Sequence, residues 1–168
     1  MAGGKVKKPI LVVGVGNSIQ MDDGVGVHVI REMEKNILPD NVELFDGGTL
    51  GIDLLPWIEG HEYLILVDSI KADHPAGTIF RFHPQDIDYD DAPKTSIHQL
   101  GLIDSLKMCA LTGIAPREVV IFAVQPGVID WGEDLSPQVE ATVPKLVRLV
   151  NEEIEKINLK ISANLQEA

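Results

Sequence analysis

Side chains that commonly bind metal ions stand beside short apolar runs in this sequence. Asp22 and Asp23 follow the first run, Asp46 follows the second, Asp68 follows the third, and His98 precedes a helical pattern. Two carboxylates and one imidazole form a mixed oxygen and nitrogen ligand set that suits nickel, zinc, manganese or iron. Such a set leaves coordination positions for water or for groups of a partner molecule.

The apolar runs predict the strands that would position these side chains. The runs Ile10–Val15, Val42–Phe45, Tyr63–Val67 and Val119–Val124 are short and rich in Val, Ile, Leu and Phe. Three of them are nearly continuous, which is typical of strands buried on both faces of a parallel sheet. A fifth run, Thr78–Phe82, partly alternates and predicts a strand at the sheet edge.

Helical patterns separate the apolar runs. Their apolar residues recur at spacings of three and four within Val27–Ile37, Leu50–Ile58, Leu102–Ala110 and Val139–Ile154. The alternation of strands and helices predicts a single-domain α/β protein with a mostly parallel five-stranded sheet and helices on both faces. In such a sheet, ligands bind outside the carboxyl ends of the strands. The acids and His98 are therefore expected to converge on one rim of the sheet.

Each of these residues also has an ordinary structural interpretation. Asp22 could cap the helix that continues through Val27, with Asp23 favoured by the positive end of the same helix. Asp46 before two glycines fits a turn, Asp68 could cap a turn, and His98 could be a structural histidine. Convergence on the rim is what favours a shared site.

The glycines after the first run have a backbone explanation, a sharp turn and close chain packing. A dinucleotide loop is disfavoured, because Ile19 replaces the third glycine of that motif and the acids that follow would repel a pyrophosphate.

The composition argues against several classes of protein. The net charge of −12 over 168 residues argues against nucleic-acid binding, which needs a basic face. The single cysteine, Cys109, permits no intrachain disulfide, and it sits in an apolar helical pattern that predicts burial. No signal-peptide pattern or membrane-length apolar stretch is found, so we expect a cytoplasmic protein.

The chain is expected to form one folded domain, residues 9–157. Residues 1–8 are expected to be a flexible N-terminal extension, and residues 158–168 a C-terminal tail, because the helical periodicity fades after Ile157. The segment Gln85–Lys94 reads as an exposed acidic loop. The remaining histidines are interpreted as surface residues: His28, His61, His74 and His83.

Several motifs, in order along the chain, resemble those of the hydrogenase maturation proteases. They are Gly14-Val-Gly-Asn17, Asp22-Asp23-Gly24-x-Gly26-Val27, Asp46-Gly47-Gly48-Thr49, Asp68 and His98-Gln99-Leu100-Gly101-Leu102. The resemblance runs from about Ile10 to Val150 and is more specific than any single motif.

The resemblance implies a three-layer α/β/α fold and an endopeptidase that removes a C-terminal extension from the large-subunit precursor of a nickel–iron hydrogenase. It implies metal contacts by Asp23, Asp68 and His98, to nickel that the precursor itself carries, with other divalent metals as substitutes. Asp46 matches a position proposed to matter for cleavage, and Asp23 is the second candidate catalytic residue. The alternatives are a metal-dependent hydrolase of a small substrate and a flavodoxin-like nucleotide- or flavin-binding module.

Overall fold

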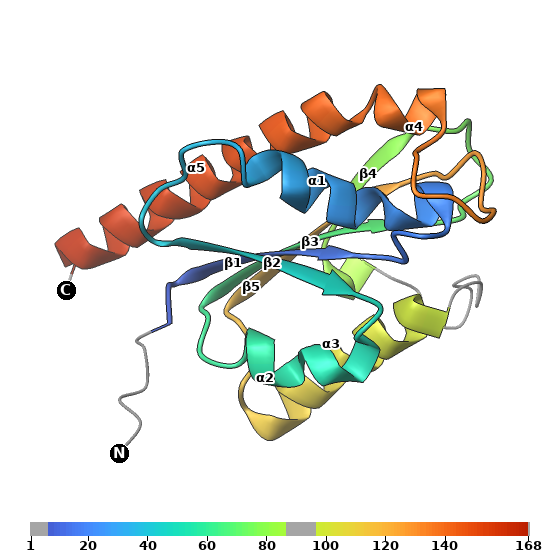
Figure 1. Ribbon diagram of the computed structural model, residues 1–168. Coiled ribbons are helices and arrows are strands. Elements are labelled where there is room, and N and C mark those ends of the chain that lie inside the picture. Colours follow the sequence, from blue (N-terminus) through green and yellow to red (C-terminus); the bar gives the residue numbers. More distant parts are fainter. Residues whose placement is uncertain (1–6, 87–96, 168) are drawn as a thin grey trace, which may run out of the picture.

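A five-stranded sheet forms the centre of the molecule, between two layers of helices (Figure 1). The computed structural model describes residues 7–86 and 97–167, with the side chains of residues 97–101 left out. The strands are β1 (Ile10–Val15), β2 (Val42–Gly48), β3 (Tyr63–Ser69), β4 (Ile79–Phe82) and β5 (Glu118–Val124). Their order is β2-β1-β3-β5-β4, and all neighbours are parallel except β4 and β5. The predicted fold class and the predicted edge strand are confirmed.

Helices cover both faces of the sheet. On one face lie α1 (Val25–Met33), α4 (Pro137–Glu140) and α5 (Val143–Glu167), and on the other lie α2 (Leu55–Ile58) and α3 (Ile97–Thr112) (Figure 1). Three 3-10 turns complete the fold: η1 (Met21–Gly24), η2 (Gly51–Leu54) and η3 (Pro84–Asp86). Among the described helices, none is long and apolar enough to cross a membrane.

The predicted helix Val139–Ile154 is divided between α4 and α5 at Ala141 and Thr142, and the ends of α1 and α5 depart from the predicted ends. α1 ends at Met33, so Ile37, which the pattern had included, lies beyond the helix and is fully exposed. α5 continues to Glu167, past the predicted loss of helix after Ile157. Ile157 is the last buried residue of α5, so the apolar periodicity marked the end of the packed face rather than the end of the helix. Continuing an existing helix costs little, because each further residue adds one hydrogen bond.

The core consists of two apolar clusters, one on each side of the sheet. Alternate residues of β1 point to opposite faces, so Ile10 and Val12 join the cluster under α1 and α5. Leu11 and Val13 join the cluster under α2 and α3. Cys109 is fully buried in this second cluster, as predicted, and burial raises the pKa of its thiol.

His61 is a buried residue, so its interpretation as a surface histidine was wrong. Its side chain is almost completely enclosed, and Nδ1 donates to the carbonyl oxygen of Lys8 at 2.7 Å. Burial lowers the pKa of His61 below its ordinary value, and the backbone hydrogen bond opposes this shift. His61 thus fixes the chain where it enters β1.

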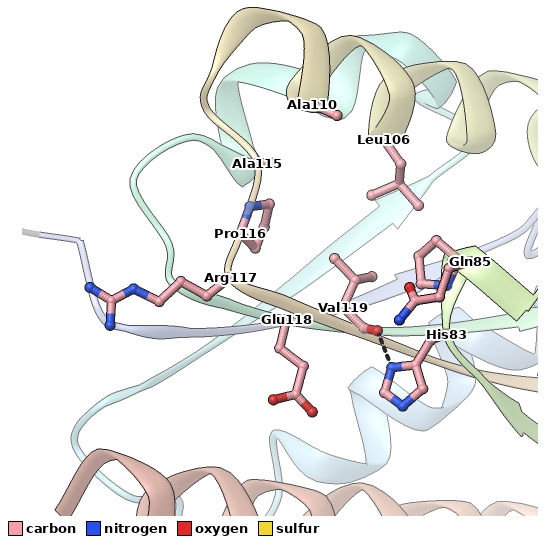
Figure 2. A pocket seen from close by; sticks show the side chains of 10 residues that line it. His83, Gln85, Leu106, Ala110, Ala115, Pro116, Arg117, Glu118 and Val119 are labelled. Carbon is pink, nitrogen blue, oxygen red and sulfur yellow. Dashed lines mark hydrogen bonds between the residues drawn. The ribbon is translucent and has the colours of Figure 1, made fainter. Parts of the chain in front are cut away.

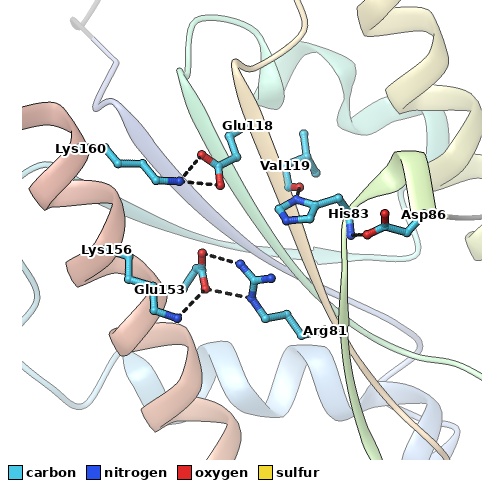
Figure 3. Close-up of polar contacts among 8 residues, drawn as sticks. All are labelled: Arg81, His83, Asp86, Glu118, Val119, Glu153, Lys156 and Lys160. Atoms are coloured by element: carbon cyan, nitrogen blue, oxygen red, sulfur yellow. Dashed lines mark hydrogen bonds and ion pairs between the residues drawn. The ribbon is translucent and has the colours of Figure 1, made fainter. Parts of the chain in front are cut away.

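Glu153 joins α5 to the edge strand β4 (Figure 3). Its buried carboxylate accepts from Arg81 Nε at 3.0 Å and from Arg81 Nη2 at 2.9 Å, and Lys156 Nζ lies 3.6 Å away. Burial raises the pKa of Glu153, but the hydrogen bonds and positive charges of Arg81 and Lys156 outweigh it, so the pKa is lowered overall.

Replacing Glu153 with glutamine is expected to lower the free energy of unfolding at neutral pH by about 1–3 kcal/mol, since one partner, Arg81, is partly exposed and screened. Because the carboxyl pKa is lower in the folded state, its contribution is complete above the ordinary value of 4.5 and is lost as pH falls through the folded value. Urea unfolding across this pH range should therefore show the wild-type and variant stabilities converging in acid. The same change at the exposed Glu152 should have little effect, and parallel pH curves for wild type and Glu153→Gln would contradict the assignment.

Candidate functional site

The strand order reverses between β1 and β3, so the carboxyl ends of these two strands are the switch point of the sheet. The chain leaves β1 towards β2 on one side, whereas β3 and β5 lie on the other side. Ligands of open α/β sheets bind at such a point. Asp23 lies in η1, shortly after β1, and Asp68 is the penultimate residue of β3. The topology therefore places both acids at the predicted rim.

Ser69 connects the two carboxylates directly. Its backbone N–H donates to Asp68 Oδ1 at 2.7 Å, and its hydroxyl donates to Asp23 Oδ1 at 3.1 Å. All three residues are at most 4% exposed. The structure thus brings Asp23 and Asp68 together, although they are far apart in the sequence. The sequence analysis gave Ser69 no role, and its position directly after Asp68 was the available signal.

The loop after β1 folds back so that Asp23 faces the strand end. Asp23 Oδ2 accepts from the backbone N–H of Asn17 at 3.0 Å, and the Asp23 N–H donates to the Gln20 carbonyl at 3.2 Å. Gly16 makes this return possible, because it has a φ of +132° and a Cβ there would lie 1.9 Å from the Asp23 carbonyl oxygen. The loop therefore fixes the orientation of the carboxylate.

The start of α1 lies almost in contact with the sheet at Gly26. A Cβ on Gly26 would lie 2.1 Å from the carbonyl oxygen of Val67, the residue before Asp68. This close approach confirms the backbone interpretation of the glycines and brings η1 next to the end of β3.

Asp22 fastens a second loop to the site, so its interpretation as a helix cap was wrong. Gly24 occupies the N-cap position of α1, and no side chain caps the helix. Asp22 is fully buried, and its Oδ2 accepts from the N–H groups of Gly127 and Val128, both at 2.8 Å. The hydroxyl of Ser136 donates to Oδ2 and its N–H donates to Oδ1, both at 2.7 Å. Asp22 therefore ties η1 to the loop 125–136 between β5 and α4.

Asp46 lies near the end of β2 and is partly exposed. Its Oδ1 accepts from the Gly48 N–H at 3.1 Å, and its Oδ2 lies 3.7 Å from Arg31 Nη2. The first contact is the turn interaction that the glycines suggested. A catalytic role for Asp46 stays a prediction.

His98 belongs to the first turn of α3, and its side chain lies outside the described residues. The hydroxyl of Ser105 donates to the Gly51 carbonyl at 2.8 Å and fixes α3 beside η2. Figure 1 shows α3 beginning on the side of the molecule where β2 ends. Among the side chains that the structure describes, no three His, Cys, Asp or Glu residues form a metal-binding group. The complete ligand set of Asp23, Asp68 and His98 is therefore a proposal.

A separate pocket of about 390 Å³ lies at the amino end of β5 (Figure 2). Asp68 pairs with Ala123 at the opposite end of this strand. The pocket is lined by Leu106 and Ala110 of α3 and by the start of β5, where His83 Nδ1 donates to the Val119 carbonyl at 2.8 Å. Since ligands of this sheet class bind at the opposite ends of the strands, the rim with Asp23 and Asp68 is the stronger candidate.

Comparison with known proteins identifies the family of this chain. A model described as hydrogenase maturation protease matches residues 27–153, a range that contains Asp68 and His98 and begins after Asp23. The Hydrogenase 2 maturation protease of Escherichia coli is 37% identical over 136 residues, covering 80% of this chain and 83% of the relative. A hydrogenase expression/formation protein HupD of Rhodobacter capsulatus is 36% identical over 137 residues, covering 80% of this chain and 65% of the relative.

The same family appears among solved structures. The hydrogenase maturating endopeptidase HybD from Escherichia coli superposes with a TM-score of 0.80 at 33% identity, covering 88% of this chain and 92% of that one. The predicted family and the predicted endopeptidase class are thereby confirmed over the small-substrate hydrolase and the cofactor-binding module. The chain belongs to the hydrogenase maturation protease family.

Proposed function

We propose that this chain removes a C-terminal extension from the large-subunit precursor of a nickel–iron hydrogenase, and that it recognises nickel already held by that precursor through Asp23, Asp68 and His98. The observation that carries the proposal is the pair of buried carboxylates, Asp23 and Asp68, joined through Ser69 at the switch point of the sheet. Family membership supports the reaction class.

The chemistry of these residues suits a divalent cation. Two ionised carboxylates held close together repel each other, and a cation between them offsets this repulsion. The N–H of Asn17 and the N–H and hydroxyl of Ser69 orient the carboxylates, as the outer partners of metal ligands commonly do. Oxygen and imidazole ligands together fit nickel among other transition metals.

Nickel supplied by the substrate would make cleavage a test of whether nickel has been inserted. Asp23, Asp68 and His98 would bind the loaded precursor more tightly than the empty one, because only the loaded form offers a cation. A metal ion can polarise a carbonyl group or acidify a bound water. The partly exposed Asp46, or Asp23 itself, is the candidate general base that would accept the proton of the attacking water.

The test compares cleavage of nickel-loaded and nickel-free precursor by the purified chain. We expect the loaded precursor to lose its extension and the nickel-free precursor to remain intact, and mass spectrometry of the large subunit would report both. Adding nickel to the empty precursor should restore cleavage, which controls for damage during preparation. Equal cleavage of the two forms would remove nickel recognition from the proposal.

A further inference from the structure

Exposed apolar side chains gather on two loops beside the candidate site. Ile19 follows β1, and Val128, Ile129 and Trp131 belong to the loop after β5. Their exposed fractions are 47%, 42%, 40% and 76%, respectively. We call these four residues the apolar lip. Exposed apolar groups that cluster on a surface commonly mark an interaction site, whereas single exposed residues do not.

The backbone of the apolar lip is held in place, because its two loops are hydrogen-bonded to each other. The N–H of Gly132 donates to the Ile19 carbonyl at 3.0 Å, and the N–H of Met21 donates to the Gly132 carbonyl at 2.8 Å. The buried Asp22 then holds the same loop through Gly127, Val128 and Ser136. A surface that is fixed before binding loses little conformational entropy when a partner docks.

The lip is continuous with the candidate site. The Asp22 N–H donates to the Val128 carbonyl at 3.2 Å, so the lip and the backbone of η1 are in direct contact. Asp23 is the next residue along the chain. A polypeptide that reaches Asp23 and Asp68 would therefore pass close to these apolar side chains.

An acidic groove borders the other end of the same loop. It has a volume of about 480 Å³ and is lined by Asp134 and Leu135 of the loop, by Glu32 and His28 of α1, and by Glu140 of α4. His28 Nε2 donates to the Glu133 carbonyl at 3.0 Å, which holds the loop against α1. The groove thus presents three carboxylates, of which Glu32 also pairs with Lys35 at 2.6 Å, so Asp134 and Glu140 contribute most of its negative charge. Within a chain of net charge −12, basic side chains complement such a surface.

We propose that the apolar lip and the acidic groove together form the docking surface for the precursor polypeptide, which places an apolar side chain against Trp131 and Ile129 and basic side chains in the groove. The proposal rests on the function proposed above and adds the chemistry by which the substrate is held. The lip supplies apolar contact at the mouth of the site, and the groove supplies long-range attraction.

The first experiment measures steady-state cleavage of nickel-loaded precursor by Trp131→Ala. We expect KM to rise roughly tenfold or more, because large aromatic residues dominate binding surfaces, while kcat stays within about twofold. Ile129→Ser should raise KM in the same direction, and it provides a second variant should Trp131→Ala fold poorly. The matched control is Leu165→Ala, since Leu165 is 74% exposed near the C-terminal end of α5 and its replacement should leave KM unchanged.

The second experiment tests the groove with the double variant Asp134→Asn/Glu140→Gln. We expect a higher KM at low ionic strength and a weaker dependence of KM on salt, because added salt screens the attraction that the carboxylates provide. If both lip variants kept the wild-type KM, the apolar lip would have no role in docking. If the dependence of KM on salt were unchanged in the double variant, the acidic groove would have no role in docking. If nickel-free precursor were cleaved equally but KM still rose for Trp131→Ala, nickel recognition would fail while the docking surface stood.

Discussion

Replacing Asp23 or Asp68 with asparagine is expected to slow processing of nickel-loaded precursor by on the order of 100-fold or more, with the fold retained. Changes to residues that merely orient metal ligands typically cost about 10- to 100-fold, so a change to a direct ligand should cost at least as much. Asparagine keeps the size of the side chain and can accept through its remaining oxygen. It removes the negative charge that attracts the cation.

Cleavage rates and thermal unfolding together would distinguish lost chemistry from lost structure. Ser69→Ala removes the hydroxyl that bridges to Asp23 and should give a smaller loss, about 10-fold, in line with an orienting role. His98→Ala should abolish processing without changing the unfolding temperature. If Asp23→Asn, Asp68→Asn or His98→Ala processed the precursor at the normal rate, the replaced residue would not be a metal ligand in the reaction.

Replacing Asp22 with alanine is expected to lower the free energy of unfolding by about 3–5 kcal/mol, the sum of two or more hydrogen bonds to a charged acceptor at about 1.5–3 kcal/mol each, which is the largest stability effect we predict for a single side chain. The change removes the acceptor of four hydrogen bonds from Gly127, Val128 and Ser136. The freed donors must then find water or remain unpaired, and each unpaired buried donor costs about 1–3 kcal/mol. Chemical denaturation would measure the loss directly.

A graded series would show whether these hydrogen bonds act as described. Ser136→Ala removes one donor, the hydroxyl, and should cost about 1 kcal/mol. Asp22→Asn should lower the free energy of unfolding by an amount between those of Ser136→Ala and Asp22→Ala. The amide oxygen can keep the contacts made by Oδ2, while the amide NH₂ group would face the N–H of Ser136, which it cannot accept from. Equal stability of Asp22→Ala and wild type would show that loop 125–136 is held by other contacts.

The sheet could be predicted from the sequence because its central strands are buried on both faces. β1 and β3 are nearly continuous apolar runs, a composition typical of parallel strands that helices cover on both faces. The convergence of Asp23 and Asp68 was also predictable, since the carboxyl ends of adjacent parallel strands lie on one rim. These inferences needed the order of elements along the chain and no detail of side-chain contact.

The features that escaped prediction depend on partners distant in the sequence. The hydrogen-bond partners of the Asp22 side chain lie at least 105 residues away, so local patterns could suggest only a helix cap. His61 is buried because the chain before β1 passes over it, and the carbonyl of Lys8 is 53 residues away. The extent of α5 was missed for a different reason, since an exposed helix end leaves no apolar periodicity.

The enclosed thiol of Cys109 makes the native chain suitable for site-specific labelling. It is the only cysteine in the sequence, it is fully buried, and burial raises its pKa, so the reactive thiolate is scarce at neutral pH. A cysteine introduced at an exposed position such as Leu165 would therefore react selectively with a maleimide dye, and Cys109 would not have to be replaced. Fluorescence anisotropy of that dye could then follow assembly with a partner in real time.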